Sequence, residues 1–312
     1  MKSSEGEVVP FPYPDISEPI VINPNDAGGQ VEIWLNHVER LMRKSVARSL
    51  DLSMADYAVK PRVKWVLEWP GQVVLCVTQT YWTQYAVTAI RDEGAQGLLR
   101  YAEQCTTDLF NIVDLVRNKL PKLLRKTLSA LVVIDVHARD VAAELGHLGV
   151  DNENSFDWQS QLRYYFLDNG VSSQTAKPGT VECRIINALR LYGYEYLGNS
   201  MRLVITVILS CLFPFNREFI LQPLTDRCYR TLMGAVHLDM GGAPEGPAGT
   251  GKTETTKDLG KAVAIQCVVY NCSDSLDYKA MGKFFKARNI NILIFDSLCM
   301  PGSCRFRCLG LF

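Results

Sequence analysis

The stretch from Gly246 to Thr253 reads Gly-Pro-Ala-Gly-Thr-Gly-Lys-Thr and fits the pattern G-x-x-x-x-G-K-[ST] at every fixed position. Such a loop closes around phosphate oxygens, and Gly249 and Gly251 leave the room that a Cβ would fill. Lys252 supplies a cation for the β and γ phosphates, and Thr253 supplies a hydroxyl for Mg²⁺. A helix that opens at Gly251 directs its positive end at the anion. The pattern therefore predicts a triphosphate-binding loop between a strand and a helix.

The residues on either side of this loop distinguish a true phosphate-binding site from a Gly-rich turn that matches the pattern by chance. Apolar residues recur on one face of residues 253–264, which predicts a helix, and Gln266 to Asn271 is typical of a short buried strand. Leu238 to Glu245, before the loop, is a weaker strand candidate because it holds two glycines. The order strand, helix, strand favours nucleotide binding over coincidence.

Composition limits the other classes of function. The chain has 312 residues, of which 47% are hydrophobic, so it suits two domains or one domain with a flanking arm. Lys plus Arg and Asp plus Glu number 33 each, so no overall charge recruits nucleic acid or an anionic membrane. The longest apolar run, Leu203 to Phe215, is shorter than the ~18 residues of a membrane crossing. We expect neither nucleic acid nor membrane as a partner.

The 10 cysteines are spread along a chain whose first residues form no apolar signal segment, which favours a reducing cytoplasm over a disulfide framework. Cys299, Cys304 and Cys308 lie close together but lack the paired C-x-x-C spacing of zinc sites. A zinc site formed by these three cysteines is thus the weaker alternative to unligated cysteines. His37, His137 and His147 are isolated from one another, so each is interpreted as a surface or core residue.

The first 200 residues are predicted to be mainly helical. Residues 1–30 hold five prolines and form an irregular lead-in, whereas Val31 to Leu50 has apolar residues at helical spacing. Helical spacings also mark Tyr81 to Val116 and Pro121 to Leu145. Long helices of this kind build an arm rather than a catalytic pocket.

Strands are predicted further along the chain. Tyrosines alternate with small or charged residues from Leu191 to Leu197, which predicts a half-buried strand, and Arg202 to Thr206 predicts another. Linker-like residues between Gly170 and Val181 place the domain boundary there.

With these residues in view, the chain closely resembles dynein heavy chains, the axonemal group in particular. The similarity covers about residues 30–206 and 223–285. The matching segments are Val66–Gln72, Ala130–Asp140, Gln161–Tyr165, Tyr192–Asn199 and the dense run from Pro223 through the phosphate loop to Phe285.

The resemblance implies an α+β chain in which a mainly helical linker arm precedes a partial α/β P-loop (AAA+) module. It divides the chain into a lead-in (1–30), a linker segment (31–180), the start of the first AAA+ module (181–285) and a divergent tail (286–312). ATP and Mg²⁺ are the implied cofactors. The implied partners are microtubules and dynein intermediate and light chains, although the microtubule-binding region is not expected in this chain. The implied location is the cytoplasm, cytoskeleton and ciliary axoneme. The expected nucleotide contacts are Gly246, Pro247, Ala248, Gly249, Thr250, Gly251, Lys252 and Thr253, with Pro223 and Leu224 near the adenine and Thr253 on the metal.

Two departures from the family pattern bear on activity. Residues 207–222 form an apolar insertion that is expected to displace the adenine-side wall. Near the C-terminus, Ile292 to Phe295 followed by Asp296 imitates a Walker B strand, but Ser297 stands where a catalytic Glu is needed, and a hydroxyl is no general base. We interpret this match as coincidence because the tail lacks family resemblance, and we assign no catalytic residue.

Two hypotheses follow. In the first, the chain is a truncated part of a motor that couples ATP hydrolysis to movement along microtubules, and it binds ATP without turning it over. In the second, it is a non-enzymatic helical interaction fragment whose nucleotide pocket does not function.

Overall fold

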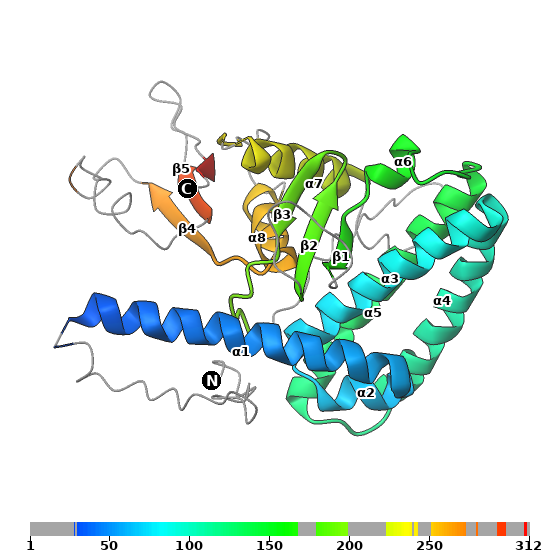
Figure 1. The fold of residues 1–312 in the computed structure, drawn as a ribbon, viewed down its shortest axis with the longest axis horizontal. Coiled ribbons are helices and arrows are strands. Elements are labelled where there is room, and N and C mark those ends of the chain that lie inside the picture. The colour runs from blue at the N-terminus through cyan, green and yellow to red at the C-terminus, as the bar shows by residue number, and fades with distance from the viewer. Residues whose placement is uncertain are drawn as a thin grey trace, which may run out of the picture.

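The computed structural model describes residues 28, 30–167, 179–198, 223–238, 240–242, 251–272, 279, 292–297 and 309–310. A helical bundle forms one end of the described part, and a three-stranded sheet lies between this bundle and helix α8, Lys252–Ala262 (Figure 1). Strands β4, Cys267–Cys272, and β5, Ile292–Ser297, lie beyond α8, farthest from the bundle.

The helical arm has five main helices, separated by prolines and a glycine. Pro61, Pro70 and Pro121 each stand immediately before a helix in an extended conformation, where a missing N–H removes no helical hydrogen bond. Pro70 also restricts Trp69 to extended backbone, which ends the preceding helix. The helices are α1 (Val31–Val59), α2 (Arg62–Glu68), α3 (Gly71–Glu93), α4 (Ala95–Val116) and α5 (Lys122–His147).

Small residues set how closely these helices approach. Gly94 joins α3 to α4 with φ +60°, a conformation that glycine adopts without steric cost. A Cβ on Gly97 would lie 2.4 Å from the backbone oxygen of Ala89, and one on Gly146 would lie 2.7 Å from Leu99. The bundle therefore depends on glycine at both contacts.

An antiparallel sheet follows the short helix α6, Phe156–Gln159. Its order is β1 (Arg163–Leu167), β2 (Thr180–Ile185), β3 (Ala188–Leu191), with Tyr164 opposite Cys183 and Cys183 opposite Arg190. Strand β1 packs on α3, and β3 packs on helix α7, Pro223–His237. Because β1 and β2 are hydrogen bonded across the proposed boundary at 170–181, the linker segment and the module share this sheet.

A second sheet follows α8. Strand β4 pairs parallel with β5, with Cys267 opposite Ile292, and β5 pairs antiparallel with the two-residue strand β6, Leu309–Gly310.

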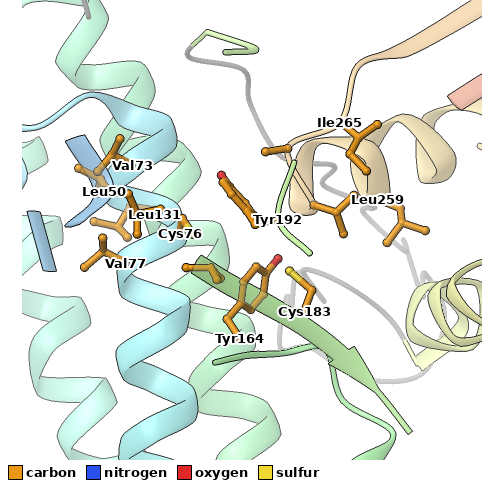
Figure 2. Close-up of a cluster of buried hydrophobic side chains, with 14 of the residues drawn as sticks. Leu50, Val73, Cys76, Val77, Leu131, Tyr164, Cys183, Tyr192, Leu259 and Ile265 are labelled. Carbon is orange, nitrogen blue, oxygen red and sulfur yellow. The ribbon is translucent and has the colours of Figure 1, made fainter. Parts of the chain in front are cut away.

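One apolar core joins the arm, the first sheet and α8. Figure 2 shows Tyr164, Cys183 and Tyr192 between arm residues on one side and residues of α8 and its following turn on the other. The labelled arm residues are Leu50, Val73, Cys76, Val77 and Leu131, and those on the α8 side are Leu259 and Ile265. A smaller cluster, built around Trp158 and Leu98, fills the far end of the bundle.

The structure confirms the mainly helical arm and the helix and strand after the phosphate loop. The predicted strand at Leu191 to Leu197 is wrong, because β3 ends at Leu191 and the chain leaves the sheet after one further bond, from the amide of Tyr192 to the carbonyl of Val181 at 2.9 Å. Tyr194 has φ +56°, and the amides of Gly193 and Glu195 donate to residues just after α8 and not to a strand. The alternation of tyrosines in this segment reflects burial of Tyr192 in the core and does not mark a β-strand.

Several predicted segments fall outside the described residues. These are nearly all of the lead-in, the strand at 202–206, the insertion at 207–222 and the three C-terminal cysteines. Of the predicted strand at 238–245, the structure describes 238 and 240–242, which contain a single bridge at Gly242 and no strand. Within the described helices, none is long and apolar enough to span a membrane.

Candidate functional site

Helix α8 begins where the phosphate-loop pattern places a helix. Gly251 precedes it with φ 77° and ψ 16°, a left-handed conformation that a side chain would strain. Lys252 and Thr253 are the first two helical residues, and both side chains are half-buried. The first amides of a helix point out of its N-terminal end, where the helix dipole favours negative charge.

These residues fit a phosphate group and its metal. A left-handed glycine followed by a helical turn directs successive backbone N–H groups to one side, which makes a concave anion site. Lys252 adds a mobile cation, and Thr253 adds a hard oxygen of the kind that Mg²⁺ prefers. The geometry at Gly251, Lys252 and Thr253 therefore suits the end of a nucleotide's phosphate chain. Among the described residues there is no ready-made group of three His, Cys, Asp or Glu ligands, so a metal here would rely on the phosphates and Thr253.

The body of α8 is fixed by buried contacts on one face. Thr255 and Thr256 donate their hydroxyls to the carbonyls of Gly251 and Lys252, at 2.9 and 3.1 Å. Tyr229 of α7 donates its hydroxyl to the buried carboxylate of Asp258. The second turn of the helix is therefore bound to α7 through Asp258.

The C-terminal end of α8 is bound to the arm and the first sheet. The hydroxyl of Tyr164, on β1, donates to the carbonyl of Ala262 at 2.9 Å. The amide of Gly193 donates to the carbonyl of Val263 at 2.8 Å, and the amide of Glu195 donates to Ala264 at 3.1 Å. These bonds satisfy carbonyls that the last helical turn leaves without a partner inside the helix.

Glu195 connects this end of α8 to two helices of the arm. Its carboxylate accepts from the guanidinium of Arg43 on α1 at 2.8 Å and from the amide of Gln266 at 2.5 Å. Its backbone carbonyl accepts from Gln72 Nε2 on α3 at 2.7 Å, and Gln72 Oε1 accepts from the amide of Leu197 at 2.9 Å. We call Glu195, Arg43, Gln72 and Gln266 the Glu195 junction.

Strand β5 brings the Walker B-like residues into the second sheet. Asp296 is opposite Asn271 in a parallel register, so the carboxyl ends of β4 and β5 share one edge. Ligands bind at this edge in open α/β sheets. The segment is thus a strand in the structure, and the coincidental origin that we assigned to it stays a prediction.

The structure describes only part of the predicted site. Gly246, Pro247, Ala248, Gly249 and Thr250 lie outside the described residues, while Gly251, Lys252 and Thr253 lie together at the start of α8. Pro223 and Leu224 are the first two residues of α7, and their predicted place beside an adenine stays a prediction.

Sequence reasoning missed the residues that hold α8. The Glu195 junction joins positions more than 70 residues apart, so no local spacing marks it. Tyr229 and Asp258 belong to no recognisable sequence motif either. The one available signal was the short segment around Gly193, whose glycine between two tyrosines marks a close backbone approach.

Comparison with known proteins places the site in a family. Residues 192–288 match the family described as the hydrolytic ATP binding site of the dynein motor region. The chain is 52% identical over 286 residues to dynein axonemal heavy chain 3 of Homo sapiens and 51% identical over 286 residues to dynein axonemal heavy chain 12 of Rattus norvegicus, in each case over 92% of this chain. It is 50% identical over 256 residues to dynein axonemal heavy chain 1 of Homo sapiens, over 82% of this chain. It spans only 6%, 8% and 5% of the lengths of these three relatives.

Proposed function

The chain belongs to the axonemal dynein heavy chain family, and we propose that it binds Mg–ATP at the N-terminus of α8 without turning the nucleotide over on its own. The observation that carries this is the left-handed Gly251 followed at once by the helical Lys252 and Thr253. Lys252 would hold the β and γ phosphates and Thr253 the metal ion. The bound Mg²⁺ would offset phosphate charge.

The absence of turnover rests on Ser297. It follows Asp296 at the end of β5, and even if this strand acted as a Walker B strand, a serine would stand where a carboxylate is needed to activate water. A serine hydroxyl accepts no proton from water at neutral pH, so binding would not lead to hydrolysis.

The contacts at the other end of α8 support a role for the arm in this site. Tyr164 binds the last turn of α8 and the Glu195 junction binds the segment just after it, so a shift of this helix on nucleotide binding would act on α1, α3 and β1. We propose that the chain contributes ATP-dependent movement of this kind to a microtubule motor of the ciliary axoneme, together with the dynein intermediate and light chains.

An ATP titration tests the proposal. Mg–ATP should bind saturably to the purified chain, and Lys252→Ala should weaken binding at least about tenfold through loss of the phosphate cation. Lys257→Ala is the matched control, since Lys257 lies on the same helix and pairs with Glu254 away from the motif. No binding at millimolar nucleotide, or equal affinity in Lys252→Ala, would refute nucleotide binding. Steady phosphate release above the Lys252→Ala background would refute the absence of turnover.

A second candidate function is an interaction role of the arm. The start of α1 carries Val31, Ile33 and Leu35 with 62%, 40% and 50% of their surfaces exposed, an unusual apolar segment for a helix end. If the titration shows no nucleotide binding, the arm alone would account for any activity of the chain.

A further inference from the structure

A cavity of about 230 Å³ lies within the helical arm, away from the start of α8. Helices α3, α4 and α5 supply most of its wall, and α1, α2, α7 and the residues Gln161 and Leu162 before β1 also line it. Among the residues that the structure describes, neither those of the phosphate loop nor those of the Glu195 junction line it. The cavity is therefore separate from the proposed ATP site.

The lining combines aromatic side chains with an excess of negative charge. Three carboxylates, of Asp108, Asp135 and Asp226, face one guanidinium, that of Arg62, so two negative charges are in excess when His137 is neutral. The aromatic residues in the wall are Tyr57, Trp82, Tyr85, Tyr101 and Tyr229. Acidic groups beside aromatic faces are the surroundings that organic cations prefer.

Asp135 has hydrogen-bonding capacity that the protein leaves unused. Its Oδ1 accepts from the Nη2 of Arg62 at 2.6 Å, and its Oδ2 has no partner among the residues that the structure describes, although the side chain is only 7% exposed. Thr78, in the same wall and 6% exposed, has an unpartnered hydroxyl. A buried acceptor without a donor costs free energy, so the wall carries negative charge that the protein compensates only in part.

The other carboxylates are not neutralised by the surrounding protein. Asp108 forms no ion pair with any residue that the structure describes. Asp226 lies 4.0 Å from the Nε2 of His137, which is beyond hydrogen-bonding distance. Burial raises the pKa of both Asp135 and Asp226. Arg62 partly opposes this effect at Asp135, and His137 and Arg230 partly oppose it at Asp226.

Other classes of ligand fit this lining less well. An anion such as a nucleotide would meet three carboxylates. Within the part of the chain that the structure describes, no three acidic, His or Cys side chains are close enough to hold a metal ion. A purely apolar molecule would leave the oxygen of Asp135 unsatisfied.

We propose that this cavity binds a small alkylammonium ion. The ammonium group, with three N–H donors, lies at the carboxylates of the wall. The alkyl chain packs against the tyrosine and tryptophan faces.

Titration of the full chain with pentylammonium chloride, without nucleotide, tests this proposal. Saturation-transfer NMR and the thermal shift of the protein measure binding. Saturable binding is expected below about 10 mM, a range reasonable for so few atoms. The neutral isostere 1-pentanol and an equal concentration of sodium chloride should not saturate. Equal binding of 1-pentanol would show an apolar cavity only, and absence of saturable pentylammonium binding would overturn the proposal.

Isosteric variants test the charge requirement. Asp108→Asn and Asp226→Asn remove one negative charge each, and at least one of them should weaken binding about tenfold. Asp92→Asn is the control, because Asp92 is an exposed residue of α3 outside the cavity. Circular dichroism and the melting temperature establish that each variant is folded. Unchanged affinity in both cavity variants would exclude the proposed role of the carboxylates.

Discussion

At the scale of single residues, glycine determines how closely the segment after β3 approaches α8. A Cβ on Gly193 would lie 2.4 Å from the backbone oxygen of Ala264 and 2.7 Å from the side chain of Ile265. The first contact is with backbone, which has no rotamer by which to move away. The hydrogen bond from Gly193 to Val263 therefore exists only because this residue has no side chain.

Gly193→Ala should lower the free energy of unfolding by about 2 kcal/mol or more, as expected for overpacking against rigid backbone. Gly234→Ala is the matched control, since Gly234 lies within α7 and a Cβ there meets nothing within 4 Å. That substitution should stabilise by about 0.5–1 kcal/mol through helix propensity. Urea denaturation followed by circular dichroism measures both. A Gly193→Ala protein as stable as the wild type would show that the contact at Ala264 relaxes.

At the scale of elements, the Glu195 junction is the point where α1, α3 and the end of α8 are bound to one another. Arg43 forms ion pairs with both Glu39, on its own helix, and Glu195, at 2.7 and 2.8 Å. The two pairs differ in burial, because Glu195 is 8% exposed and Glu39 is 27% exposed. Only the pair with Glu195 joins different elements.

Glu195→Ala should cost about 1–2 kcal/mol of unfolding free energy, because it removes the acceptor for Gln266 in a part-buried position. Glu39→Ala should cost less than about 0.5 kcal/mol, since a half-exposed pair within one helix contributes little. Arg43 is itself more than a third exposed, so most of the Glu195 effect comes from the lost amide bond. Equal effects of the two substitutions, measured by urea denaturation, would contradict this division.

The elements that could be predicted well from the sequence are those that neighbouring residues in the chain determine. Helices α1, α5 and α8 follow from apolar spacing, and Pro121 and Gly251 mark where two of them begin. The start of the phosphate site was predictable for the same reason, since the motif itself encodes the glycine and the helix.

The elements that sequence predicted poorly depend on contacts between distant residues. The tyrosines after β3 alternate as in a strand, yet Tyr192 is buried in the core and the Tyr194 hydroxyl accepts from the amide of Val181 at 2.7 Å. Both contacts are set by tertiary packing, which overrides the local period of two. The carboxylates of the arm cavity come from α4, α5 and α7, so only the folded chain brings them together.

At the scale of the whole molecule, one core makes the arm, the first sheet and α8 a single packing unit. Cys76 of α3 and Cys183 of β2 are both buried within it. Burial raises the pKa of Cys76 to about 12, and it also raises the pKa of Cys183 well above its ordinary value. The thiolate, which is the reactive form, is therefore negligible at both positions near neutral pH.

Iodoacetamide at pH 8 should leave Cys76 and Cys183 unmodified in the folded protein and modify both at the same denaturant concentration. Since both thiols need a pH near or above their raised pKa to ionise, native labelling should stay slow as the pH rises toward 10. Cys228, half-buried on α7, is the internal reference and should react first. Peptide mass mapping reads out all three sites. Modification of Cys183 well before Cys76 would show that the sheet opens separately from the arm.

The shared core has a practical consequence for anyone who wishes to dissect this polypeptide. Cleaving it between Tyr164 and Gly193 to obtain the phosphate-binding part alone would remove Tyr164 and the arm from the end of α8 and expose the apolar core residues that packed against them. The exposed turn at 117–119, between α4 and α5, touches none of those contacts. A reporter or protease site inserted there should leave the packing of α8 unchanged.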